Sequence, residues 1–169
     1  MICSLEPLQL EAVFARALGT THPLFSERGI QATSDIQTGL PPVYADADRL
    51  HQVLTNLLAN AVKFSPEGGT VRLSGKKKEG FALISVVDEG PGIPPDRLEQ
   101  IFERFHQVRD PQKSHPLGTG LGLTISREIV DKMGGNIWVE SRLGEGAVFF
   151  FTVPLFGKTH RERRKNQQI

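Results

Sequence analysis

Apolar residues recur at two different spacings along this chain, and these spacings predict helices and strands. Between residues 5 and 28 they fall at helical intervals, so we expect a helix there with a weak point at Pro23. A stronger helical pattern runs to about Phe64, and Asp46 or Asp48 can cap its N-terminus. The first two helices of the predicted fold therefore lie in the N-terminal 64 residues.

A third helical pattern follows much later in the chain. It begins at Gly120 or Leu121 and ends at the glycine pair 134–135. A glycine just after the last apolar turn is typical of a helix C-terminus. The spacing predicts a buried face made of Leu121, Ile125, Ile129 and Met133.

Alternating apolar residues predict the strands. We expect an edge strand at residues 30–36, a hairpin of strands 71–74 and 81–87, and a second hairpin of strands 136–141 and 147–153. Helices on one face of a mixed, mainly antiparallel sheet make an α+β fold, a two-layer sandwich. The connection over residues 88–117, with one short helix near residues 96–102, is long, and loops of this size tend to be functional lids or disordered.

Length and charge limit the domain organisation and the partners. The 169 residues suit a single domain over residues 1–155, followed by a basic tail or linker at 156–169. The net charge is +1, but residues 158–165 alone carry a net charge of +4 and the rest of the chain −3, which argues against a nucleic-acid surface on the domain. Without a long apolar run we expect no membrane contact from this segment and a cytoplasmic location, although a longer parent protein could be membrane-anchored.

Polar side chains line one face of the second predicted helix. Asn56, Asn60 and Lys63 stand at i, i+4 and i+7, opposite the apolar positions of the same helix. An amide oxygen is a hard ligand that suits Mg²⁺, and a lysine can contact phosphate. Taken alone, this face is better explained as a solvated helix surface.

A single carboxylate follows the apolar strand at residues 81–87. Asp88 can accept a hydrogen bond from the exocyclic amino group of adenine, whereas guanine has a carbonyl at that position. Gly90 and Gly92 let the backbone turn sharply beside a flat base. The alternative is a plain turn, since Asp, Gly and Pro are all turn formers.

The glycine-rich stretch GTGLGL at residues 118–123 precedes the third helix. A helix N-terminus presents free N–H groups, so this stretch can bind an anion or can simply begin the helix. It lacks the Gly-Lys-Ser/Thr of a Walker loop. Arg104 can reach a phosphate or remain solvated, and the five histidines have no spacing typical of a metal site.

As an ordered set, these motifs resemble the ATP-binding catalytic domain of sensor histidine kinases. The set comprises Asn60 with Lys63, Asp88-x-Gly90-x-Gly92, IFERF at 101–105, GTGLGL, and Gly144-x-Gly146. Such domains belong to the Bergerat-fold ATPases, which include DNA gyrase, MutL and some heat-shock chaperones. The resemblance covers about residues 44–154.

The resemblance implies a role for each matching residue. Asn60 and Lys63 would be catalytic, with Asn60 holding Mg²⁺ and Lys63 contacting phosphate, while Asp88 would bind adenine. Residues 105–119 would form a mobile lid. The residues implied in ATP binding are Asn56, Asn60, Lys63, Asp88, Gly90, Gly92, Ile93, Arg104, Phe105, Gly118, Thr119, Gly120, Leu121 and Gly122.

Two further features bear on the reaction. Hydrolytic relatives have a glutamate base one turn before the Mg²⁺ asparagine, and this chain has Asn56 there, which favours phosphoryl transfer. No histidine fits the acceptor motif His-Glu/Asp-x-x-x-Pro. The resemblance thus implies a protein histidine kinase whose acceptor lies on a separate helical dimerisation domain, with a response regulator downstream.

The isolated chain is then expected to bind ATP without phosphorylating itself. The alternatives are a non-catalytic ATP-binding sensor or docking module, or a serine-directed kinase or hydrolase of the same fold.

Overall fold

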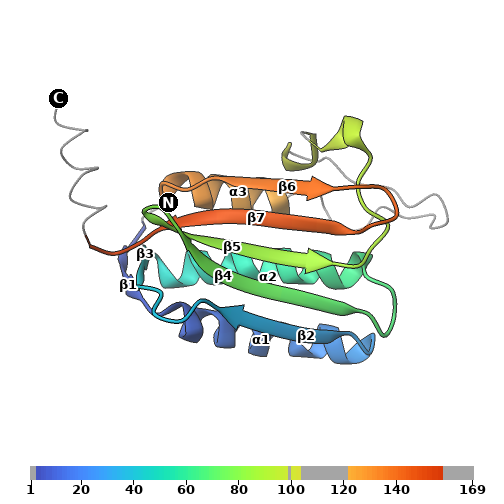
Figure 1. Ribbon diagram of the computed structural model, residues 1–169, viewed down its shortest axis with the longest axis horizontal. Coiled ribbons are helices and arrows are strands. Elements are labelled where there is room, and N and C mark those ends of the chain that lie inside the picture. The colour runs from blue at the N-terminus through green and yellow to red at the C-terminus, as the bar shows by residue number, and fades with distance from the viewer. Residues whose placement is uncertain (1–2, 99, 104–121, 158–169) are drawn as a thin grey trace.

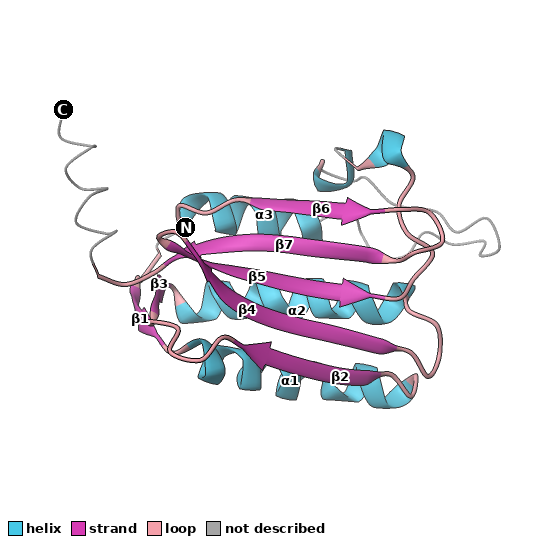
Figure 2. Ribbon diagram, in the orientation of Figure 1, coloured by secondary structure: helices cyan, strands magenta, loops and turns pink. Residues whose placement is uncertain are grey.

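The computed structural model describes residues 3–98, 100–103 and 122–157. In this part three helices cover one face of a five-stranded sheet, as Figures 1 and 2 show. The elements in chain order are β1 (Glu6–Leu8), α1 (Leu10–Glu27), β2 (Gln31–Ile36), β3 (Val43–Ala45), α2 (Ala47–Phe64), β4 (Thr70–Lys78), β5 (Phe81–Asp88), the 3₁₀ turns η1 (Pro95–Arg97) and η2 (Gln100–Phe102), α3 (Gly122–Lys132), β6 (Ile137–Ser141) and β7 (Ala147–Pro154).

The sheet has the strand order β2-β4-β5-β7-β6. Its three central and C-terminal pairings are antiparallel, and only the edge strand β2 runs parallel to its neighbour β4. The predicted two-layer α+β sandwich with a mainly antiparallel sheet is therefore confirmed. Strand β5 lies in the middle of the sheet, and its C-terminal residue, Asp88, pairs with Ala147 of β7, while the preceding Val87 pairs with both β4 and β7.

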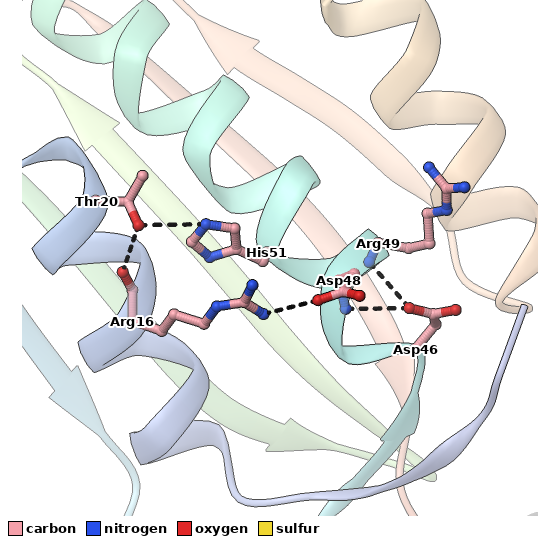
Figure 3. Close-up of polar contacts among 6 residues, drawn as sticks. All are labelled: Arg16, Thr20, Asp46, Asp48, Arg49 and His51. Carbon is pink, nitrogen blue, oxygen red and sulfur yellow. Dashed lines mark hydrogen bonds and ion pairs between the residues drawn. The ribbon is translucent and has the colours of Figure 1, made fainter.

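Helix α2 packs across the middle of the sheet because its apolar residues recur every three to four positions. Leu50, Leu54 and Leu57 are fully buried against the strands and against α1 and α3. The helix begins at a cap in which Asp46 Oδ1 accepts hydrogen bonds from the N–H groups of Asp48 and Arg49, each at 3.1 Å (Figure 3). Of the two caps that the sequence allowed, Asp46 is the one used.

The N-terminal helix is shorter than predicted. Residues 6–8 form β1, which pairs antiparallel with β3, and α1 begins only at Leu10. The prediction of a helix from residue 5 is wrong because Leu5 and Leu8 mimic helical spacing while the backbone is instead paired with a strand that was not predicted. Pro23 lies inside α1 without ending it.

Two other predicted segments also differ. The short helix expected near residues 96–102 consists of two separate 3₁₀ turns, η1 and η2. In α3 the expected apolar residues Ile129 and Met133 are buried, but Ile125 is only half-buried and Ser126 is fully buried. The predicted start at Gly120 or Leu121 and the predicted burial of Leu121 lie outside the described residues.

Figure 3 shows polar contacts where α1 and α2 meet. Arg16 Nη1 lies 3.2 Å from Asp48 Oδ1, and Thr20 Oγ1 lies 3.3 Å from His51 Nε2. The side chains of the ion pair are 52% and 86% exposed, so this contact adds little to stability. His51 therefore belongs to the packing between these two helices.

Candidate functional site

Helix α2 presents its polar face toward the start of α3. Asn56 Nδ2 donates to the carbonyl oxygen of Gly122 at 3.3 Å and to Ser126 Oγ at 3.4 Å. Asn60, one turn later, is half-buried and makes no side-chain hydrogen bond to another described residue. Lys63 is exposed in the last turn of the helix. The last glycine of the GTGLGL stretch therefore contacts the asparagine face of α2.

Asp88 is the last residue of β5 and is only 5% exposed. It lies on the same face of the strand as Ala82, Ile84 and Val86, which is the face covered by α2. Its Oδ1 accepts a hydrogen bond from the N–H of Gly90 at 2.9 Å. No cationic side chain of the described residues pairs with this carboxylate.

Burial raises the pKa of Asp88 above its usual range, and the backbone N–H groups of Gly90 and Ala147 only partly oppose this effect. The charged form of a carboxylate is disfavoured where it is desolvated. A buried acid without a cation, at the end of a central strand, is costly to the fold and is a common feature of binding sites. Asp88 is therefore the described residue whose environment points most directly to a ligand.

The turn after Asp88 is pressed between two other parts of the backbone. A Cβ on Gly90 would lie 2.6 Å from the carbonyl oxygen of Phe64, at the end of α2. Gly92 has φ +79°, and a Cβ there would lie 2.2 Å from the carbonyl oxygen of Arg142. Both glycines are required by close approaches within the protein, which the sequence did not reveal.

The hairpin between β6 and β7 holds this turn in place. Gly144 N–H donates to Pro91 C=O at 2.7 Å, and a Cβ on Gly146 would lie 2.2 Å from the carbonyl oxygen of Asp88. The hydroxyl of Ser141 accepts from Ile93 N–H at 2.8 Å and donates to Gly146 C=O at 2.7 Å. The predicted glycines 144 and 146 thus pack against the Asp88 turn, and Ser141 is a further contact that no sequence pattern pointed to.

Described parts of several of these motifs meet around the C-terminal half of α2. Gly122 contacts it at Asn56 and Gly90 packs against it at Phe64, eight residues further on. Eight residues of α-helix span about 12 Å, and Asn60 lies midway between the two contacts. Ile93 follows the turn and is buried in the core. Asn56, Asn60, Lys63, Asp88, Gly90, Gly92, Ile93 and Gly122 therefore lie in one region.

Six predicted site residues cannot be placed in this way. They lie outside the described residues, and their assignment to the site remains a prediction. These residues are Arg104, Phe105, Gly118, Thr119, Gly120 and Leu121.

Within residues 3–98, 100–103 and 122–157, no group of three or more His, Cys, Asp or Glu side chains could hold a metal ion. The donor that fits Mg²⁺ is instead the amide oxygen of Asn60, which is half-buried on α2. Mg²⁺ is usually bound by one or two protein oxygens together with waters and substrate phosphates, rather than by a protein cage. The residues present therefore suit a magnesium ion that arrives with a nucleotide.

A groove of about 430 Å³ lies elsewhere, between α1 and the first residues of β2. Its walls include Leu18, Phe25 and Ile30, and none of the motif residues lines it. It is therefore separate from the candidate site. In the described part of the chain, no helix combines the length and apolar character needed to cross a membrane.

Comparison with known proteins identifies the family. Residues 45–157 match the family described as histidine kinase-, DNA gyrase B- and HSP90-like ATPases. The chain belongs to this ATPase family. The match begins one residue after the resemblance noted in the sequence and includes all of its motifs, so the predicted relationship is confirmed.

Individual relatives agree with this assignment. The chain is 46% identical over 158 residues to the adaptive-response sensory kinase SasA of one strain of Prochlorococcus marinus, and the match covers 92% of this chain and 41% of that protein. The chain thus spans about two fifths of the length of the SasA relatives that it matches.

Solved structures share the fold. Full-length ShkA in complex with AMPPNP has a TM-score of 0.81 at 36% identity, covering 92% of this chain and 32% of that one. The histidine kinase ThkA in complex with the response regulator TrrA has a TM-score of 0.75 at 28% identity, covering 90% of this chain and 42% of that one. The ATPase-family domain of this chain is therefore of the histidine kinase type.

Proposed function

We propose that this chain is the catalytic domain of a two-component sensor histidine kinase. It binds Mg-ATP and positions the γ-phosphate for transfer to a histidine on a separate helical dimerisation domain. The observation that carries the proposal is the buried carboxylate of Asp88, which pairs with no cationic side chain of the described residues and is followed by a turn packed against the C-terminal end of α2. Family membership and the AMPPNP complex of the related ShkA support ATP as the ligand.

Asp88 recognises the base in this proposal. A carboxylate only accepts hydrogen bonds, so it selects a base with an amino group where adenine has one. One oxygen is fixed by Gly90 N–H, and this leaves further acceptor capacity for the ligand. Because the carboxylate is desolvated, a partner that donates to it restores part of the solvation lost on folding. Ile93 is proposed to lie beside the base.

The phosphates lie at the other end of this region. Asn60 would hold Mg²⁺, Lys63 would contact a phosphate, and the N–H groups of residues 118–122 would line the phosphate chain at the N-terminus of α3. When bound, the metal neutralises charge on the phosphate oxygens. Arg104, Phe105 and Leu121 complete the proposed site.

Asn56 favours transfer over hydrolysis. Its amide donates hydrogen bonds to Gly122 C=O and Ser126 Oγ, so this side chain acts as a donor between α2 and α3. A general base needs to accept a proton near neutral pH, which an amide does not do. A hydrolase of the same fold would need such a base at this position.

The remaining partners follow from the proposed reaction. The chain spans about two fifths of its SasA relatives, so the acceptor domain is proposed to lie in the rest of a longer protein. A response regulator would receive the phosphoryl group, as the complex of ThkA with TrrA suggests for a related kinase. We further propose a single domain over residues 1–155 with a basic tail, and a cytoplasmic location.

A reconstitution experiment tests the proposal. The chain is mixed with a dimerisation hairpin that carries an acceptor histidine, radiolabelled ATP and Mg²⁺. We expect an acid-labile label on the hairpin histidine, no label on the chain alone, and no steady phosphate release. Tight ATP binding without transfer would support the alternative, a non-catalytic sensor or docking module.

A further inference from the structure

The hydroxyl of Ser141 is engaged on both sides at the junction between the Asp88 turn and the β6–β7 hairpin. It accepts a hydrogen bond from Ile93 N–H at 2.8 Å and donates one to Gly146 C=O at 2.7 Å. The three residues are half-buried or buried. Without the hydroxyl, a largely buried N–H and a buried C=O would each lose this partner, and such groups are costly to leave unpaired.

The strand register brings Ser141 into line with Asp88. Ser141 pairs with Ala147 across β6 and β7, and Ala147 pairs with Asp88 across β7 and β5. Two strand spacings separate Ser141 from Asp88, a distance of about 10 Å. Ser141 is therefore too far away to touch the carboxylate of Asp88, and any effect on that carboxylate must pass through the backbone.

The backbone offers a short path for that effect. Ser141 fixes Ile93 on one side of the turn, and Gly146, its other partner, packs against the carbonyl group of Asp88. Next to this contact, the hydrogen bond from Gly144 N–H to Pro91 C=O joins the same two segments. The turn from Asp88 to Ile93 is thus held at both of its ends by groups that bond to one hydroxyl.

We propose that Ser141 is a positioning residue for adenine recognition, which holds the turn from Asp88 to Ile93 in the conformation that selects the base. The inference rests on the proposed function, because it assigns to Ser141 the pre-organisation of a site whose ligand is an adenine nucleotide. Holding a binding group in place before the ligand arrives reduces the cost of binding. Ser141 therefore affects discrimination between bases, as well as stability.

The experiment compares two nucleotides that differ at position 6 of the base. ADP carries an amino group there and inosine diphosphate carries a carbonyl group, and calorimetry measures the Kd of each. For Ser141→Ala we expect a loss of ADP affinity of roughly tenfold, a smaller loss for inosine diphosphate, and hence a reduced preference for adenine. Ser141→Thr keeps the hydroxyl and is expected to retain both affinities.

The matched control is Ser74→Ala. Ser74 hydrogen-bonds to Ser85 across β4 and β5, away from the turn, so its loss removes a hydroxyl pair without touching the junction. We expect this variant to keep the ratio of the two Kd values. An unchanged ratio in Ser141→Ala, or an equal change in the Ser74→Ala control, would overturn the inference.

Two further results keep the test decisive. Hydrogen exchange on the unmodified chain reports on Ile93 even if Ser141→Ala does not fold: the Ile93 amide should be protected, and exchange as fast as that of a free amide would overturn the inference. If the unmodified chain binds neither nucleotide, the proposed function fails and the inference fails with it. If it prefers ADP and Ser141→Ala prefers ADP equally, only the inference fails.

Discussion

The side-chain amide of Asn56 lies 3.3 Å from the carbonyl oxygen of Gly122, 66 residues further along the chain. This contact joins the asparagine face of α2 to the last glycine of the glycine-rich stretch. A second bond from the same Nδ2 atom to Ser126 Oγ, at 3.4 Å, extends the contact to the next turn of α3. The side-chain amide of Asn56 therefore fixes the position of α2 relative to α3, the two helices that flank the proposed phosphate site.

Asn56→Asp is expected to weaken this contact between α2 and α3. The new carboxylate cannot donate to Gly122 C=O and places one acceptor against another, although Ser126 can still donate to it. We expect a loss of about 1–2 kcal/mol in the free energy of unfolding. Urea denaturation measures the loss, with Thr55→Ala as the control, because Thr55 bonds only within its own helix. Equal stability of Asn56→Asp and the unmodified chain would contradict the proposed role of the donor.

Gly144 and Gly146 form a matched pair for a second prediction. Both have positive φ, at +81° and +78°, so alanine is strained at either position. Only Gly146 is also crowded, because a Cβ there would lie 2.2 Å from Asp88 C=O, whereas nothing lies within 4 Å of one at Gly144.

We therefore expect Gly144→Ala to lose about 1–2 kcal/mol of stability through strain alone. Gly146→Ala should lose more than this, and it should also lose ADP affinity, since it displaces the end of β5. Thermal unfolding and calorimetry measure the two effects. Equal effects of the two substitutions would show that the contact with Asp88 does not matter.

The N-cap of α2 gives a prediction with a defined pH window. Burial raises the pKa of Asp46, but the N–H groups of Ser4, Arg49 and Asp48 outweigh this effect and lower the pKa below its ordinary value of 3.8. A carboxyl whose pKa is lowered by folding stabilises the protein above its unfolded pKa, and this stabilisation is lost as the pH falls through the folded pKa.

Asp46→Ala should therefore cost about 1 kcal/mol at neutral pH, and the difference from the unmodified chain should shrink below about pH 4. Urea denaturation across this range measures it. Asp48→Asn is the control, because Asp48 is exposed and forms only a surface ion pair. A cost that stays constant down to low pH would show that the ionised cap is not responsible.

Asn60 tests the magnesium end of the proposed site. Since Asn60 is proposed to hold the metal and Asp88 the base, Asn60→Ala should remove the part of ATP affinity that depends on Mg²⁺. Binding measured with a chelator in place of Mg²⁺ should be close to that of the unmodified chain. Calorimetry with and without Mg²⁺ separates the two contributions. If Asn60→Ala lost the same ATP affinity with and without Mg²⁺, Asn60 would not act through the metal.

Much of the fold could be predicted because its elements have strong local signals. The apolar spacing of α2, its acidic cap and the alternation in β5 and β7 each determine an element without help from distant residues. The strands β1 and β3 could not be predicted in this way. Their conformation depends on pairing between Leu8 and Val43, which are far apart in the sequence.

The same distinction holds for the candidate site. Asp88, Asn60 and the glycines could be identified because their residue types and order are specific to a chemistry. Ser141 carries no such signal, since a serine at the end of a strand is ordinary and its partners Ile93 and Gly146 come from other elements. Likewise, the sequence predicts that Gly92 lets the backbone turn beside a base, whereas its missing side chain also makes room for Arg142 C=O.

Asp88→Asn separates the effect of the buried carboxylate on stability from its effect on ATP binding. Because burial raises the pKa of Asp88, the folded chain binds more protons than the unfolded chain between 3.8 and the raised value, and stability falls as the pH rises through this window. Asparagine can still accept from Gly90 N–H but carries no charge. Without nucleotide, Asp88→Asn should therefore raise Tm at neutral pH and lose this pH dependence, as thermal unfolding at several pH values will measure.

The same substitution tests the central claim most directly when ATP binding is measured by calorimetry. The unmodified chain should bind ATP with Mg²⁺ and should bind GTP far more weakly, while Asp88→Asn should lose most of its ATP affinity although it is folded and more stable. ATP binding by Asp88→Asn as tight as that of the unmodified chain would contradict the assignment of Asp88 to adenine, and with it the account of this site.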